Sequence, residues 1–125
     1  MSENELSKII VNKSFEIHKG LGPGLLESVY EDILTYELRQ SGLMVSRQQA
    51  LPVLWKGEKM EQGFKADLIV ENKVLIELKS VDTLAPVFYK QVLTYLKITG
   101  LKLGLLINFN EPLLRDGIKR IVNGL

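Results

Sequence analysis

Two extended segments separated by only three residues constrain the fold of this chain more than any other feature. Residues 63–70 read GFKADLIV and residues 74–80 read VLIELKS, and both are rich in the apolar residues that strands favour. We therefore predict two strands joined by the residues ENK. The second strand should be buried, yet it carries Glu77 and Lys79, which lie two residues apart and so on one face of the strand.

The length of the connection decides which residues lie opposite one another. If ENK is a three-residue loop, Val70 pairs with Val74 and Asp67 lies directly opposite Glu77. Opposed Cβ atoms are about 5 Å apart, and like charges at that distance destabilise a sheet. A two-residue loop would instead place Asp67 across from Ile76, on the apolar face. Either register destabilises the hairpin. A divalent cation between the two carboxylates would remove the repulsion that the three-residue loop creates.

The charged residues of this hairpin have the chemistry of a metal-dependent site for phosphodiester hydrolysis. The carboxylate oxygens of Asp67 and Glu77 suit magnesium or manganese. Lys79 can orient an attacking water, help to deprotonate it, or stabilise the charge on the attacked phosphate. In the alternative interpretation the three residues line the solvated face of a half-exposed hairpin, with Glu77 and Lys79 as a surface ion pair. The motif alone does not decide, because short motifs often match by chance.

The rest of the chain predicts elements in an order typical of an α/β domain. Ser2 and Glu5 form a capping box that opens a first helix, and the glycines of residues 20–24 end it. The other expected elements are a helix from Leu25 to Arg39, extended residues 44–56, a turn around Gly57, a helix from Pro86 to Gly100, a central strand at 103–109 and an edge strand in the tail. We expect a central mixed β-sheet flanked by helices, in a single domain that spans residues 1–125.

Four residues outside the hairpin are candidates for the same site. Glu27 lies on the flank of the apolar face of the second helix, where it either reaches a cleft or only interacts with the helix dipole. Tyr30, about one turn further along, is expected in the core. Gln91 and Tyr95 are four residues apart on the third helix. Apolar neighbours predict a buried Gln91, whose amide would need hydrogen-bond partners, and a Tyr95 that packs in the core.

The composition excludes several classes of protein. Without cysteine and with a single histidine, His18, the chain has no disulfide or thiolate zinc site and little support for a triad hydrolase. No apolar run is long enough to span a membrane and the polar N-terminus has no signal-peptide pattern, so we expect a cytoplasmic protein. The net charge of +1 gives no bulk attraction for nucleic acid, which would need a local basic patch.

In their order along the chain, these residues resemble the GxxExxY proteins of the PD-(D/E)XK nuclease-like superfamily. Gly24-x-x-Glu27-x-x-Tyr30 comes first, KADLIV and VLIELKS follow, and QVLTY comes last. The likeness covers about residues 15–123 and implies a restriction-endonuclease-like fold. The chain departs from the superfamily motif at Ala66, where the motif has proline.

The resemblance also implies a role for each candidate residue. The expected ligands of Mg²⁺ (or Mn²⁺) are Glu27, Asp67 and Glu77. Lys79 would activate water, and Gln91 would orient the lysine or a phosphate. The catalytic set implied by the resemblance is therefore Lys79, Glu77, Asp67 and Gln91.

Two functions are consistent with these residues. The first is a magnesium-dependent nuclease that hydrolyses phosphodiester bonds of nucleic acid, with DNA favoured over RNA. The second is a non-catalytic module that binds nucleic acid or a protein and carries a vestigial nuclease site. The intact set of acids and lysine favours the first function. Small size and near-neutral charge favour the second, or an enzyme that borrows DNA affinity from a partner protein or from a second copy in a homodimer.

Overall fold

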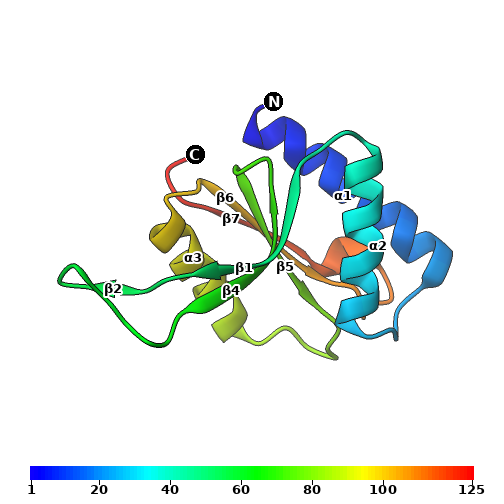
Figure 1. Cartoon of the computed structure of the whole chain (residues 1–125). Helices are drawn as coiled ribbons and strands as arrows, with labels where there is room; N and C mark the ends of the chain where they lie inside the picture. Colours follow the sequence, from blue (N-terminus) through cyan, green and yellow to red (C-terminus); the bar gives the residue numbers. More distant parts are fainter.

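The structure, a computed structural model that describes residues 1–125, has a five-stranded sheet with helices on both faces (Figure 1). In chain order the elements are α1 (Glu3–Leu21), α2 (Glu27–Gln40), β1 (Val45–Leu51), β2 (Leu54–Trp55), β3 (Glu58–Lys59), β4 (Phe64–Val70), β5 (Val74–Lys79), α3 (Pro86–Thr99), β6 (Leu103–Asn108), the 3₁₀ helix η1 (Leu114–Gly117) and β7 (Ile118–Val122). The predicted mixed sheet between helices is confirmed. None of the helices combines the length and the apolar character that crossing a membrane requires.

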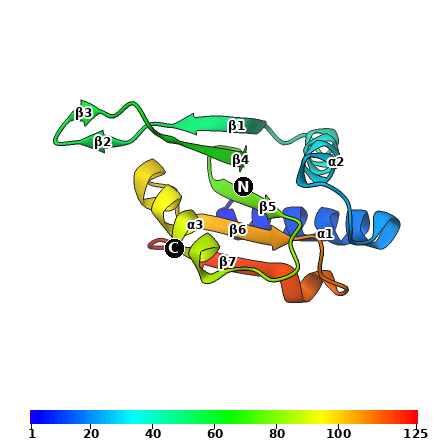
Figure 2. The same cartoon turned by 90° about the horizontal axis from the view of Figure 1, so that it is seen from below.

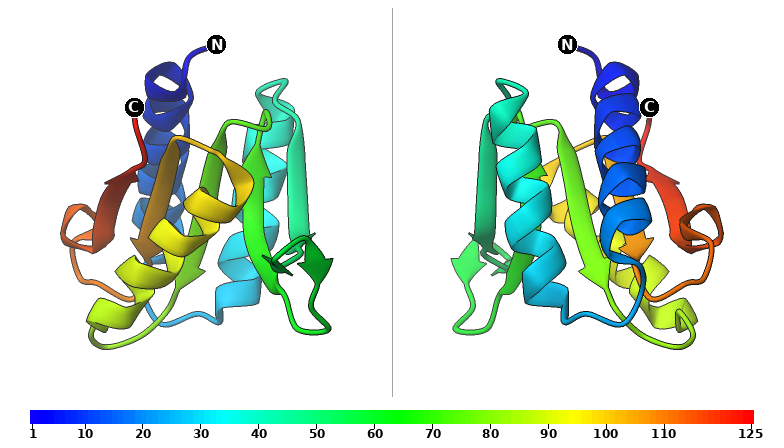
Figure 3. Two further views of the ribbon diagram at one scale, coloured as in Figure 1. Left: turned by 90° about the vertical axis from the view of Figure 1, so that its left-hand side faces the viewer. Right: turned by 90° about the vertical axis from the view of Figure 1, so that its right-hand side faces the viewer.

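The five strands lie in the order β1-β4-β5-β6-β7, and only β5 and β6 run parallel. Parallel neighbours need a long crossover, which α3 provides between β5 and β6. The short β2–β3 hairpin pairs separately and projects from the sheet (Figure 2). Figure 3 shows α3 on one face of the sheet and α1 with α2 on the other. The predicted edge strand in the tail is β7.

The helix ends follow the signals in the sequence. The backbone N–H of Glu5 donates to Ser2 Oγ, and the backbone N–H of Ser2 donates to Glu5 Oε1, both at 3.1 Å, so the capping box is confirmed. Pro86 opens α3, where its missing N–H leaves no helical bond unmade. Gly100 ends α3 in the left-handed conformation, with φ of 76°, which costs a glycine little.

Two buried clusters hold the layers together. The larger lies between the sheet and the α1–α2 pair, and it contains Tyr30, whose ring stacks on Phe109 at 4.4 Å. The Tyr30 hydroxyl donates to the carbonyl of Gly22 at 2.6 Å, so the buried phenol has a partner. The smaller cluster lies under α3 and includes Val92 and Leu96. The expected core position of Tyr30 is therefore confirmed.

The β4–β5 hairpin has the register of a three-residue loop. Val70 pairs with Val74, and the ladder continues to Leu68 opposite Ile76. The apolar residues of β5 therefore alternate between the two faces. Ile76 packs towards α1 and α2, and Leu75 packs towards α3.

The β1–β4 ribbon changes face at Gln48 and Asp67. In a regular strand Val45 and Leu51 would share a face, yet Val45 packs in the larger cluster and Leu51 in the smaller one. Between them Gln48 has φ of 49°, a left-handed backbone that is uncommon for a residue other than glycine. The pairs on either side, Arg47 with Leu68 and Gln49 with Ala66, put Gln48 opposite Asp67. This local twist lies beside the candidate site.

Candidate active site

The strands β4 and β5 separate where Asp67 and Glu77 should pair. The ladder stops at Leu68 and Ile76, and two carboxylates then take the place of backbone acceptors. Oε1 of Glu77 accepts the backbone N–H of Asp67 at 3.0 Å, and Oδ2 of Asp67 accepts the backbone N–H of Leu78 at 2.8 Å. The predicted juxtaposition of Asp67 and Glu77 is therefore present, and their carboxylates lie in the gap between the strands.

Glu77 is a buried acid with a strongly shifted pKa. Its exposed fraction is 7%, and no lysine, arginine or histidine lies within 4.0 Å of its carboxylate. Burial first, and then the negative charge of Asp67, raise the pKa of Glu77 to about 8. The N–H of Asp67 and the charge of Lys79 oppose this rise. The interpretation of Glu77 and Lys79 as a surface ion pair on a solvated face is wrong, because Glu77 is buried and unpaired.

Lys79 follows Glu77 by two residues at the end of β5 and is half-buried. Its Nζ lies 4.4 Å from the centroid of the Phe88 ring on α3, where the electron-rich face of the ring attracts a cation. Asn108 neighbours Lys79 on β6, and the Phe109 N–H donates to the Lys79 carbonyl at 2.9 Å. The backbone of Lys79 therefore pairs with β6, while its ammonium group contacts the ring of Phe88.

Glu27 reaches the same end of the sheet from the first turn of α2. Its side chain is exposed, and Oε1 accepts the backbone N–H of Ser80 at 3.3 Å. A hollow of about 350 Å³ opens beside it. The hollow is lined by Glu27, Ser28, Glu31, Gln48, Asp67 and Leu78. The fold thus gathers Glu27 and Asp67 around one hollow, whereas Glu77 does not line it.

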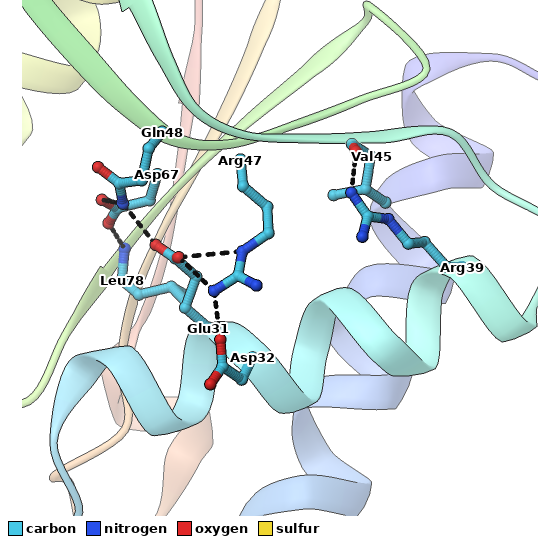
Figure 4. Close-up of polar contacts among 8 residues, drawn as sticks. All are labelled: Glu31, Asp32, Arg39, Val45, Arg47, Gln48, Asp67 and Leu78. Carbon is cyan, nitrogen blue, oxygen red and sulfur yellow. Dashed lines mark hydrogen bonds and ion pairs between the residues drawn. The ribbon is translucent and has the colours of Figure 1, made fainter.

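Glu31 is the residue of this hollow that the sequence reasoning missed. It is buried, and its Oε1 accepts the side-chain amide of Gln48 at 2.6 Å (Figure 4). The same Gln48 amide donates to Oδ1 of Asp67 at 3.1 Å, so one side chain links α2 to β4. The available signal was spacing, because Glu31 follows Glu27 by four residues and so shares its side of the helix.

Arg47 completes the polar network beside the hollow. Its Nη2 donates to Oε2 of Glu31 at 2.8 Å, and its guanidinium also contacts the carboxylate of Asp32. These hydrogen bonds raise the pKa of Arg47. The charge of Glu31 is therefore matched by a cation (Figure 4).

The two candidates on α3 have different surroundings. Gln91 is exposed and its amide makes no hydrogen bond, so the expectation of a buried Gln91 is wrong. Its neighbour Val92 is the residue that packs under the helix. Tyr95 is in the core as expected, with its ring 5.0 Å from that of Phe64. Burial raises the pKa of the Tyr95 hydroxyl, and the negative charges of Glu77 and Asp67 raise it further. The hydroxyl of Tyr95 on α3 therefore lies within the electrostatic influence of both acids.

The donor set has the chemistry of a site for a hard divalent cation. All the candidate donors are carboxylate oxygens, which suit magnesium or manganese. Burial, and then the charge of Asp67, raise the pKa of Glu77, and a cation in the gap between the strands would oppose both effects. As the side chains lie, however, no three acidic or histidine residues converge closely enough to hold a metal ion. In particular, the side-chain amide of Gln48 donates to one oxygen of Glu31 and to one oxygen of Asp67.

The fold and the split hairpin define an α/β protein whose mixed sheet carries two carboxylates in a gap between strands. Comparison with protein families matches residues 4–121 to the PD-(D/E)XK nuclease superfamily. The chain belongs to this superfamily, which supports the restriction-endonuclease-like fold and a nucleic-acid substrate. Comparisons with curated proteins and with solved structures give no match.

Proposed function

We propose that this chain is a magnesium- or manganese-dependent nuclease of the GxxExxY group, and that it acts as a single domain on DNA in the cytoplasm. The observation that carries the proposal is the gap between β4 and β5. Two carboxylates replace backbone acceptors there, and one of them is buried with a pKa of about 8. A fold gains no stability from such an acid, so a functional reason for it is favoured. A second copy or a partner protein would add affinity for the substrate.

The proposed roles are those that the superfamily resemblance implies, and the positions of the residues support them in part. Asp67 and Glu77 would hold the cation together with Glu27, which lines the same hollow as Asp67. When bound, the cation supplies charge stabilisation to the attacked phosphate and lowers the pKa of water. Lys79 would orient the attacking water or take its proton. Gln91, exposed on α3, is free to contact the lysine or a phosphate of the substrate.

The amide of Gln48 has to leave Asp67 before the carboxylate can bind a cation on that side. Glu31 would then act as a positioning residue, because it holds both Gln48 and Arg47. This prior occupation of the acids favours a second candidate function, a non-catalytic module that binds nucleic acid or a protein. The two functions differ in whether the chain cleaves.

The deciding experiment is cleavage of single-stranded, duplex and branched DNA and of RNA, with Mg²⁺, Mn²⁺ or a chelator. We expect cleavage that the chelator abolishes and that Lys79→Met reduces at least about 100-fold, a typical loss for a catalytic group. The matched control is Lys102→Met, an exposed lysine on the loop before β6. Circular dichroism establishes that both variants fold. Equal cleavage by the two variants would overturn the site, and no cleavage of any substrate would favour the binding module.

A further inference from the structure

Residues 52–63, called the arm here, leave the sheet between β1 and β4 and return to it. Within the arm, Leu54 pairs with Lys59 and Trp55 pairs with Glu58. The turn consists of residues 56 and 57, both with positive φ, of 50° and 81°. This is the two-residue turn that suits a twisted hairpin. Figures 1 and 2 show the arm extending beyond the sheet on the side away from α1 and α2.

The tip of the arm presents large apolar side chains to solvent. Trp55 is 66% exposed and Leu54 is 63% exposed. Trp55 is also the only tryptophan of the chain. A hairpin this short is at most marginally stable by itself, and its apolar side chains do not stabilise the fold while they face water. An exposed tryptophan on a projecting arm therefore indicates a binding surface.

Lysines accompany the tryptophan along the arm. Lys56 and Lys59 are exposed on the hairpin, and Lys65 is exposed where β4 begins. A hollow of about 400 Å³ at the base of the arm has Lys59 and Lys65 in its lining, together with Met60 and Phe64. Glu61 also lines this hollow, which therefore combines apolar side chains with two ammonium groups and one carboxylate. The apolar side chains can receive a base, and the ammonium groups can contact its phosphate.

The base of the arm is fixed relative to the carboxylates. A Cβ on Gly63 would lie 2.7 Å from the carbonyl oxygen of Leu51, so the two strands approach there as closely as glycine allows. Phe64 packs on Tyr95 of α3 at 5.0 Å. From Lys65, β4 reaches Asp67 in two residues. The tip is ten residues from Asp67 and therefore at most about 36 Å away. That distance corresponds to about ten nucleotides of a stacked strand.

We propose that the arm binds a single-stranded segment of the nucleic-acid substrate. Trp55 stacks on an unpaired base, while Lys56, Lys59 and Lys65 contact phosphates. An unpaired segment is inferred because a duplex buries the base faces on which an aromatic ring stacks. The inference rests on the proposed nuclease function, since the arm continues the strands that carry Gln48 and Asp67. Lys56, Lys59 and Lys65 are accompanied by Glu58 and Glu61, so the proposed phosphate contacts depend on the individual lysines and not on a surplus of positive charge.

The single tryptophan makes the first test direct. The full chain in a chelator is titrated with a single-stranded oligonucleotide of about 12 nucleotides, and with the same sequence as a duplex, while tryptophan fluorescence is followed. We expect the single strand to quench Trp55 and the duplex to leave it nearly unchanged. Anisotropy of a labelled oligonucleotide should show Trp55→Ala binding at least about 5-fold more weakly, and Trp55→Phe binding almost as well as the wild type. Tyr36→Ala, another exposed aromatic residue, is the control and should bind normally.

The charges of the arm give a second test. Lys56→Gln with Lys59→Gln should weaken binding and reduce its dependence on salt, because fewer counterions are released. The control pair is Lys8→Gln with Lys19→Gln, which removes the same charge from α1. Glu58→Gln, which removes a negative charge beside Trp55, should strengthen binding.

Several outcomes would overturn the arm as a nucleic-acid element. These are an unquenched Trp55, equal quenching by the duplex, or a Trp55→Ala variant with wild-type affinity. A blue shift on vesicles of phosphatidylcholine and phosphatidylglycerol without a response to oligonucleotide would assign the arm to membranes instead. A blue shift that grows with protein concentration, alongside a dimer in sedimentation, would assign it to a second copy. If the single strand quenches Trp55 but no substrate is cleaved, the proposed nuclease function is overturned and the arm proposal is not. If the arm variants cleave the substrate at the wild-type rate, the arm proposal is overturned and the nuclease function is not.

Discussion

Oε1 of Glu77 accepts the backbone N–H of Asp67 at 3.0 Å, where a regular hairpin would use a backbone carbonyl. The bond requires only one oxygen of the carboxyl group, so the other can carry a proton. With a pKa of about 8, Glu77 is mostly protonated at neutral pH in the absence of a cation. A cation bound at the split hairpin would therefore compete with this proton.

The first prediction concerns stability against pH. Between pH 4.5, the usual pKa of a glutamate, and about 8, the folded chain keeps a proton on Glu77 that the unfolded chain has released. The free energy of unfolding should therefore fall as the pH rises through this window, by at most about 1.4 kcal/mol per unit from this group. Glu77→Gln mimics the protonated acid, so it should keep the fold, remove this slope and raise the melting temperature at pH 8. Urea unfolding at several pH values measures this dependence of the free energy of unfolding on pH. Glu58 is an exposed acid, so Glu58→Gln should keep the wild-type slope.

A second prediction concerns the ion pair of α2 and β1. Arg47→Met should lower the free energy of unfolding by about 1–2 kcal/mol, because it leaves the buried carboxylate of Glu31 without its cation. Adding Glu31→Gln to Arg47→Met should recover part of that loss. Arg115→Met, which removes an exposed arginine, should change the value by less than about 0.5 kcal/mol. If Arg47→Met lowers the free energy of unfolding by no more than this control does, Arg47 does not stabilise the carboxylate of Glu31.

The third prediction concerns the loop that follows Lys79. Asn108 is fully buried, and its amide donates to the carbonyl of Val81 at 2.9 Å and accepts the N–H of Val81 at 3.1 Å. Asn108→Ala should cost about 1–3 kcal/mol, because the backbone N–H and carbonyl of the half-buried Val81 both lose their partner. Chemical unfolding measures this cost. Asn12→Ala, on the exposed side of α1, is the control and should leave stability unchanged or slightly higher. A cost below about 0.5 kcal/mol for Asn108→Ala would mean that water replaces the amide.

The sequence predicted the hairpin well because its constraints are local. Three residues between two strands allow few registers, and the one that pairs Val70 with Val74 brings Asp67 towards Glu77. Helix caps are equally local, as Ser2 with Glu5 and the glycine after α3 show. What the sequence did not predict was the form of the juxtaposition, because the strands separate and the carboxylates bind backbone N–H groups.

The parts that sequence reasoning missed depend on tertiary geometry. Glu31 was not selected, because a mid-helix acid is ordinary until β1 brings Arg47 and Gln48 over it. The change of face at Gln48 has no pattern in the sequence, since it depends on a single left-handed residue. Gln91 was expected inside because its neighbours are apolar. The rotation of α3 on the sheet instead buries Val92 and leaves the amide in solvent.

The last prediction concerns which acids hold the cation. Magnesium or manganese should raise the melting temperature of the wild type by mass action, and the affinity should increase from pH 6 to pH 8 as Glu77 releases its proton more easily. Asp67→Asn and Glu27→Gln should each reduce the rise in melting temperature, with Glu58→Gln as the control. Asp67→Asn should itself leave folding intact, because an amide oxygen can still accept the N–H of Leu78.

Glu31→Gln separates a ligand from a positioning residue at this site. If Glu31 only holds Gln48 and Arg47, its substitution should leave metal affinity within about 3-fold of the wild type while it lowers stability, because the amide retains only part of the bonding to Arg47. Isothermal titration in two buffers of different ionisation enthalpy measures the affinity and the protons released together. Equal affinity in the Asp67→Asn, Glu27→Gln and wild-type proteins would remove both acids from the metal site. A binding module would then be the better description of the chain.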